Sequence, residues 1–158
     1  MSSTTLCAFV RFAAISAAIC GLALCGYVYP IALNDILGFD PNIGGVNIWL
    51  VFLWLTSAPC FIILVYVWIV SGAVKRDEVF TLKTALWIKR AAVLLLVNVG
   101  IFAAGNVILL AIGLSRPNIF LLSMLVCIFG VSLALLAAVL SRYISRAADL
   151  QEEADGTI

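Results

Sequence analysis

The stretch AAVLLLVNVGIFAAGNVILLAIGLSRPNIFLLSMLVCIFGVSLALLAAVLS, residues 91–141, decides the fold, because it contains a single charged residue, Arg116. The apolar runs on either side of Arg116 each exceed the roughly 20 residues that a helix needs to cross the hydrocarbon core of a membrane. The connection between them, Ser115–Asn118, is a bare turn. We therefore predict two membrane-spanning helices that pack as a tight antiparallel hairpin.

Two further charge-free runs, residues 12–33 and 46–74, precede this hairpin. The chain has 158 residues, of which 65% are hydrophobic, and its mean hydropathy is +1.23. A soluble domain of this length cannot bury so much apolar surface, so the lipid bilayer must be its main solvent. We predict an all-α polytopic membrane protein, with residues 1–158 as one integral-membrane domain built on a four-helix transmembrane bundle. The expected spans are about 12–33, 48–72, 91–114 and 119–140, and a short acidic helical tail, 141–158, follows them.

The basic residues are distributed unequally between the two sides of the predicted membrane. Eight of them precede the first span, lie between the second and third spans or follow the fourth, whereas Arg116 lies on the opposite side. The positive-inside rule then places both termini and the middle loop in the cytoplasm. The eight residues are Arg11, Lys75, Arg76, Lys83, Lys89, Arg90, Arg142 and Arg146.

No ionisable carboxylate, amine or imidazole lies within a predicted span, which is where a membrane-embedded catalyst or a proton-coupled transporter usually carries one. The eight carboxylates are all in loops or in the tail, the chain has no His, and its five cysteines form no CxxC motif. We therefore expect no enzymatic activity, no cofactor and no metal site.

The most polar side chains within a span are those of Asn98 and Asn106, both in the third span. They are eight positions apart, so they lie within about 80° of each other around the helix axis. We expect them to form interhelical hydrogen bonds in the bundle. Contact with a transported solute or ion is the alternative.

Small residues recur at every fourth position in the first and fourth spans. Ridges of this kind let helix backbones approach closely, which is the main source of helix association in lipid. We expect them to pack within the bundle, with a homo-oligomer interface as the alternative. The two ridges are Ala13, Ala17, Gly21 and Cys25, and Gly130, Ala134 and Ala138.

The segment SGAVKRDEVFTLKTALWIKR, residues 71–90, connects the second and third spans. Gly72 is a candidate for the end of the second helix. Thr81 is a candidate N-cap of a helix that continues without a break into the third span, and Phe80 precedes it directly. The Lys and Arg residues of this loop either attract anionic lipid or belong to a surface that docks a partner.

The tail SRYISRAADLQEEADGTI, residues 141–158, begins basic and ends acidic. Its apolar residues recur at a spacing of three to four, which predicts that the fourth helix continues beyond the membrane. Acidic residues oppose the dipole at the C-terminal end of a helix, so they do not serve local stability. Complementarity to a positive surface explains them, either that of the chain's own basic loop or that of a cytoplasmic protein. An acidic, solvated end that aids solubility is the alternative.

The ending also resembles the C-terminal signature of the DUF2975 family of small four-span bacterial membrane proteins, Ala-x-Glu-Leu-x-Glu-Glu-Asn-Asp-Leu-Thr-Ile. Asp149, Ala154 and Gly156 depart from this pattern. The segment VFTLKTALWIKR is similar to the family's Phe-Thr motif at Phe80 and Thr81. The matching tail residues are Leu150, Glu152, Glu153, Asp155, Thr157 and Ile158.

Genes of this family often neighbour a gene for a small helix-turn-helix regulator, so the resemblance implies a membrane protein that holds or releases a transcription regulator. We predict a non-enzymatic protein of the bacterial inner membrane whose matching tail residues, together with Phe80 and Thr81, bind such a cytoplasmic partner. Direct binding of nucleic acid is not expected. Two alternatives stay open: a transporter or channel subunit with Asn98 and Asn106 in its path, and an immunity protein against a membrane-active peptide, for which the outer loop at 34–47 would matter most.

Overall fold

The computed structural model describes residues 3–31, 45–75 and 80–155. Within these residues, four helices are long and apolar enough to cross a membrane, with spans at Cys7–Ile31, Gly45–Val74, Leu82–Ala111 and Pro117–Gln151. The predicted all-α membrane fold is therefore confirmed. The elements are α1 (Ser3–Ala23), the π-helical segment η1 (Leu24–Val28), α3 (Gly45–Lys75), α4 (Leu82–Ala111) and α5 (Pro117–Asp155).

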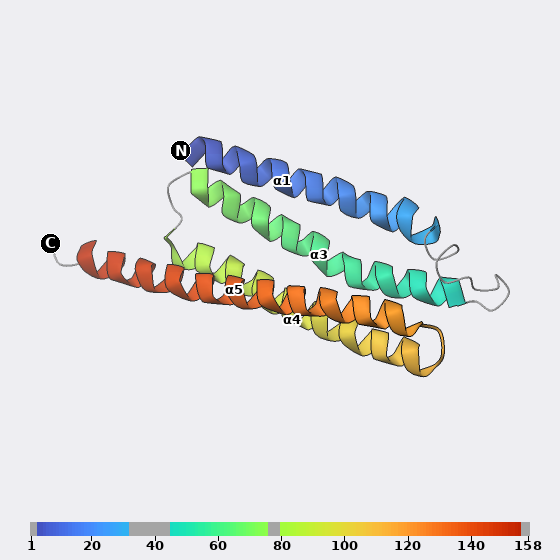
Figure 1. Cartoon of the computed structure of the whole chain (residues 1–158). Coiled ribbons are helices and arrows are strands. Elements are labelled where there is room, and N and C mark those ends of the chain that lie inside the picture. Colours follow the sequence, from blue (N-terminus) through green and yellow to red (C-terminus); the bar gives the residue numbers. More distant parts are fainter. Residues whose placement is uncertain (1–2, 32–44, 76–79, 156–158) are drawn as a thin grey trace.

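The helices follow one another in space in the order α1, α3, α4, α5, and each is antiparallel to the next (Figure 1). The first turn of α1, the end of α3, the start of α4 and the last turns of α5 lie together, and we call this end of the bundle the terminal end. At the opposite end, residues 112–116 connect α4 to α5, and we call it the hairpin end. The predicted α4–α5 hairpin is confirmed.

A specific turn closes this hairpin. Ile112 caps α4, and Gly113 follows it with a φ of 76°. The N–H of Gly113 donates to the carbonyl of Leu110 at 3.1 Å, and the N–H of Leu114 donates to that of Leu109 at 2.9 Å. These two bonds define a Schellman motif, whose left-handed residue is glycine because glycine has no Cβ to clash.

Aromatic side chains pack the hairpin end. Trp49 of α3 is buried against Leu109 of α4, and its Nε1–H donates to the carbonyl of Leu114 at 2.7 Å. The rings of Phe52 and Phe102 stack with their centroids 5.6 Å apart. These contacts bind the start of α3 to the end of α4 and to the connection that follows it.

Small residues form the helix interfaces elsewhere. Gly130 of α5 lies so close to Val99 of α4 that an added Cβ would be 2.5 Å from a valine methyl group, and Ala134 is buried. Gly21 of α1 faces the ring of Phe61 in α3. Close approach of this kind maximises van der Waals contact, which drives helix association when lipid is as apolar as the side chains. The ridge predicted on the fourth span thus packs within the bundle at Gly130 and Ala134.

The ridge predicted on the first span packs within the bundle only in part. Gly21 packs on α3, but Ala13 and Ala17 are exposed. Among the described side chains of α1, Cys7 and Ala14 are the buried ones. Positions 7, 14 and 21 repeat every seven residues, which is the seam of a helix with one close neighbour. The intramolecular role expected for Ala13 and Ala17 is therefore wrong, and a homo-oligomer interface at these positions stays a prediction.

The end of α3 also differs from expectation. The helix continues past Gly72 to Lys75, so the prediction that Gly72 ends it is wrong. Glycine lowers helix propensity but keeps its backbone N–H, and flanking contacts readily outweigh that small cost. One such contact is made by Ser71, whose hydroxyl and carbonyl both lie 3.2 Å from the sulfur of Cys7 in α1. α3 also contains Pro59 in its interior.

Candidate functional site

A hollow of about 620 Å³ lies at the terminal end, where three helices meet. Its walls come from the last turns of α3, from the residues that begin α4, and from one residue of α5, Ala148. We call it the terminal hollow. Its lining residues are Ile69, Val70, Gly72, Ala73, Phe80, Thr81, Leu82, Lys83, Thr84, Trp87 and Ala148.

Thr81 shapes the side of the hollow that α4 contributes. It is the N-cap of α4, as predicted, with extended backbone angles (φ −124°, ψ 150°). Its Oγ1 accepts a hydrogen bond from the N–H of Thr84 at 3.3 Å, and its carbonyl accepts one from the N–H of Ala85 at 3.1 Å. This capping fixes the direction in which the chain enters α4. Phe80, the residue before the cap, remains 56% exposed beside the hollow.

α5 reaches the hollow because it is tied to the first turns of α4. The hydroxyl of Ser141 donates to the carbonyl of Ala85 at 2.7 Å. Ile144 and Ala148, further along the same face of α5, are buried. The helix then continues to Asp155, which confirms the prediction that the fourth helix extends beyond its apolar run.

The structure places the predicted partner-binding residues as follows. Phe80 and Thr81 line the terminal hollow, and Leu150, two residues after Ala148, is 66% exposed on α5. Glu153 is exposed on the same helix. The backbone of α5 also includes Glu152 and Asp155, whereas Thr157 and Ile158 lie outside the described residues. The loop motif and the beginning of the tail therefore belong to one end of the bundle.

The two intramembrane asparagines have different surroundings. The Nδ2 of Asn98 donates to the carbonyl of Thr56 in α3 at 3.0 Å, which is an interhelical hydrogen bond of the expected kind. The Nδ2 of Asn106 instead donates to the carbonyl of Phe102 in its own helix at 2.8 Å. Both Oδ1 atoms are buried with no hydrogen-bond partner among the described residues. The two side chains contact different carbonyls and do not form a joint site.

Of the residues that line the terminal hollow, only Phe80 and Thr81 were predicted from the sequence as binding residues; Trp87 and Ala148 are among those that were not. Trp87 packs on Tyr66 of α3, with ring centroids 5.3 Å apart, and the guanidinium of Arg90 lies 5.0 Å from its ring centroid. The tryptophan follows the predicted N-cap by six residues, so its place near the start of α4 was readable from the sequence. An alanine carries no such signal, because only its neighbours decide whether it lines a cavity.

Among the described residues, the lining of the terminal hollow is mainly apolar, and Lys83 is its one charged side chain. The hollow adjoins a helix whose sequence becomes acidic from Asp149 onward. Such an arrangement can accept an apolar side chain in the hollow and attract positive charge beside it.

Comparison with known proteins gives one match. No curated protein and no solved structure is similar to the chain. The model of a family described as "Protein of unknown function (DUF2975)" matches residues 13–158. This range includes the second half of α1 and all of the helices that follow it. The match covers both the loop motif at Phe80 and Thr81 and the tail that resembled this family's signature. The chain therefore belongs to the DUF2975 family, as a four-helix membrane protein.

Proposed function

We propose that this protein is a non-catalytic docking protein of the bacterial cytoplasmic membrane. In this proposal the terminal end lies in the cytoplasm and binds a basic partner, with a small helix-turn-helix regulator as the partner class. The observation that carries the proposal is that the terminal hollow and the extended acidic helix adjoin each other at one end of the bundle.

The distribution of charge supports the proposed orientation. Among the described side chains, Arg11, Lys83, Lys89, Arg90, Arg142 and Arg146 belong to the half of the bundle at the terminal end, and Arg116 belongs to the hairpin end. A bias of this kind favours the cytoplasm for the basic side. The guanidinium of Arg11 also lies 5.0 Å from the ring centroid of Trp68, and paired cationic and aromatic side chains are typical of the membrane–water interface.

The last turns of α5 form the contact in this proposal. The helix from Ser141 to Asp155 is about 20 Å long at 1.5 Å per residue. Its acidic residues sit where the helix dipole disfavours negative charge, so a positive partner would stabilise them. DNA-binding proteins carry a basic surface. A regulator that docks here would therefore be kept from DNA for as long as its basic surface covers the acidic helix.

The terminal hollow supplies the apolar part of the contact. Phe80 exposes more than half of its surface beside it, and exposed aromatic residues beside a cavity are the usual anchors of a protein interface. Leu150 adds a second exposed apolar side chain on the acidic helix. Electrostatic attraction would set the rate of association, and these apolar contacts would hold the partner.

The first test is a crosslinking pull-down from native membranes, comparing the full chain with a chain truncated after Ala148. We expect a basic cytoplasmic protein that only the full chain captures. Binding of that purified protein is then measured in reconstituted membranes, with and without DNA that carries its binding site. DNA should compete with the membrane protein for the regulator.

A charge-matched pair of variants makes the test specific. Glu152→Gln/Glu153→Gln should weaken binding at low salt, and the difference should shrink as salt screens the charges. Asp35→Asn/Asp40→Asn removes two acids from the predicted opposite side and should leave binding unchanged. Equal capture by full and truncated chains, or equal binding by both double variants, would refute the docking role of the tail.

A further inference from the structure

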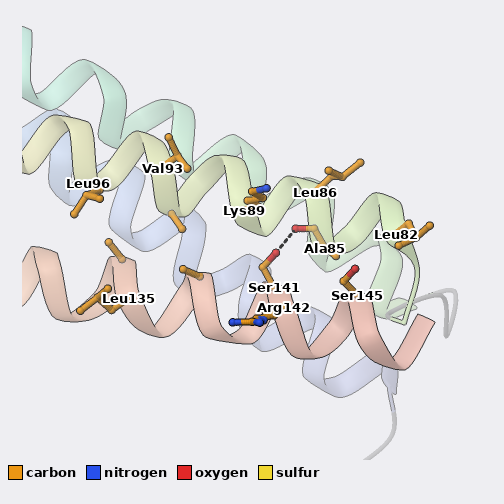
Figure 2. Close-up of a pocket in the computed structure, with 13 residues that line it drawn as sticks. Leu82, Ala85, Leu86, Lys89, Val93, Leu96, Leu135, Ser141, Arg142 and Ser145 are labelled. Atoms are coloured by element: carbon orange, nitrogen blue, oxygen red, sulfur yellow. Dashed lines mark hydrogen bonds between the residues drawn. The ribbon is translucent and has the colours of Figure 1, made fainter. Parts of the chain in front are cut away.

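A second large hollow, a groove of about 670 Å³, runs along the seam between α4 and α5 (Figure 2). Buried small residues, Ala85, Ala92 and Ala134, form its floor, since they let the two helices approach closely. Exposed Leu86, Val93 and Leu135 form its sides. We call this cavity the α4–α5 groove.

Two cationic side chains enter the groove from opposite helices. Lys89 of α4 and Arg142 of α5 both line it, and Figure 2 shows them at a similar height, between Leu86 towards the terminal end and Val93 towards the middle of the bundle. Both are exposed, and neither forms an ion pair with a carboxylate among residues that the structure describes. The groove thus has a positive position flanked by apolar surface.

The ends of the charge-free runs predict that these two cations lie at the depth of the lipid headgroups. The charge-free run of α4 begins at Ala91, directly after Lys89 and Arg90, and that of α5 ends at Ser141, directly before Arg142. From this boundary the groove extends along α4 to Leu96, about 10 Å into the apolar run at 1.5 Å per residue. Its apolar part therefore lies where acyl chains are, and its positive part lies where phosphates are.

We propose that the α4–α5 groove binds an anionic phospholipid from the leaflet at the terminal end. The phosphate lies between Lys89 and Arg142, which together can donate several charge-assisted hydrogen bonds. One acyl chain follows the groove past Val93 and Leu135. The hydroxyl of Ser141 is already bonded to the carbonyl of Ala85, so the polar recognition comes from the two cations.

A second copy of the chain fits this groove less well. The charge-free runs of its helices carry no carboxylate that could neutralise Lys89 and Arg142, and the acids of α5 begin only at Asp149, about 10 Å along the helix from Arg142 at 1.5 Å per residue. Such a helix would cover two like charges without compensation, which is unfavourable in a low-dielectric environment. A lipid phosphate provides the negative charge at the required height.

The test is a titration of the purified full chain with short-chain phosphatidylglycerol or phosphatidylcholine in neutral detergent, followed by native mass spectrometry. We expect one phosphatidylglycerol to bind in preference to phosphatidylcholine. Because each Lys or Arg near an anionic lipid contributes about a factor of five in affinity, Lys89→Gln/Arg142→Gln should weaken phosphatidylglycerol binding by roughly 30-fold.

Two further variants separate the groove from general charge attraction. Lys83→Gln/Arg146→Gln removes the same charge from the same end, but neither residue lines the groove, so binding should change little. Ala138→Leu fills an exposed position in the groove and keeps both cations, so it should weaken binding by obstructing the acyl chain. Helical circular dichroism and thermal unfolding verify that each variant is folded.

Three results would overturn the proposal. The first is an equal loss of affinity in the two double-charge variants, which would indicate general attraction to the basic end. The second is unchanged affinity in Ala138→Leu, which would place the lipid elsewhere. The third is a dimer whose formation displaces phosphatidylglycerol and is blocked by Ala138→Leu, which would make a second copy the occupant. None of these readouts depends on the protein partner proposed above.

Discussion

The hairpin end and the terminal end of the bundle are built on different kinds of packing. At the hairpin end, Trp49 donates a hydrogen bond across to Leu114, and Phe52 stacks on Phe102, so aromatic side chains fill the space between helices. At the terminal end, Tyr66 and Trp87 pack between α3 and α4, but α5 meets α4 through small residues such as Ser141 and Ala85. Two cavities, the α4–α5 groove and the terminal hollow, lie on this side.

This difference predicts that the two ends of the bundle have different roles, one in stability and the other in binding. Side chains that interdigitate across an interface contribute van der Waals contact and leave no room for a ligand. Small residues let backbones approach closely but leave exposed grooves on either side of the line of contact. We therefore expect the hairpin end to hold most of the packing energy that single substitutions can remove, and the terminal end to tolerate substitution while it binds lipid and protein.

The largest effect on stability is expected at Gly105. A Cβ at this position would overlap the ring of Phe52, which is stacked on Phe102 and cannot easily move. Gly105→Ala should therefore lower the free energy of unfolding by about 1–3 kcal/mol, measured by SDS titration in mixed micelles. The matched control is Gly100→Ala in the same helix, where nothing lies within 4 Å of the added Cβ. If both variants were equally stable, the hairpin end would not be tightly packed.

A smaller loss is expected from Trp49→Phe. The substitution removes the Nε1 donor and leaves the carbonyl of Leu114 without this bond, at a cost of about 1 kcal/mol. Trp54→Phe removes a similar bond of 3.0 Å to the carbonyl of Cys25, but Trp54 is exposed, so the smaller ring gives up less packing within the bundle and the total loss should be smaller. The same SDS titration compares them, and a larger loss in Trp54→Phe would contradict the importance of the buried contact.

At the terminal end, Ser141→Ala should cost still less. Interhelical hydrogen bonds in membrane proteins contribute about 0.6 kcal/mol on average, and this one is buried. Ser132→Ala serves as its control, because that hydroxyl is exposed and bonds only to the carbonyl of Ile128 in its own helix. A loss in Ser141→Ala as large as that in Gly105→Ala would show that both ends contribute equally to stability.

The smallest effect on stability is expected from Phe80→Ala. The side chain lies outside α4 and is mainly exposed, so the change should be within about 0.5 kcal/mol. Binding of the purified cytoplasmic partner, measured in reconstituted membranes, should nevertheless weaken, since Phe80 lines the terminal hollow. Unchanged binding together with unchanged stability would remove the loop motif from the docking surface.

The features that could be predicted from the sequence are those that depend on length and local chemistry. The uncharged runs on either side of Arg116 predicted the α4–α5 hairpin, and the hydroxyl of Thr81 predicted a capped helix start. The spacing of the tail predicted that the fourth helix continues beyond its apolar run, and α5 does so, ending at Asp155. Each of these follows from one stretch of chain in contact with lipid, water or its own backbone.

The features that could not be predicted are those that depend on which face of a helix meets a neighbour. Ala13 and Ala17 have the same spacing as Gly130 and Ala134, yet only the second pair packs inside the bundle. In a soluble protein, the polar face of a helix indicates its solvent-exposed side. Lipid and the protein interior are both apolar, so no polar face distinguishes the lipid-exposed side of a span from its buried side.

The sequence by itself thus determined the number of spans, the unequal distribution of basic residues, the helix cap and the acidic end, because charge and chain length act locally. Only the tertiary structure decided that Phe80 and Ala148 line one cavity, that Lys89 and Arg142 enter another, and that aromatic packing fills the hairpin end. These features arise where side chains of different helices meet, and in lipid that meeting is governed by the fit of their shapes.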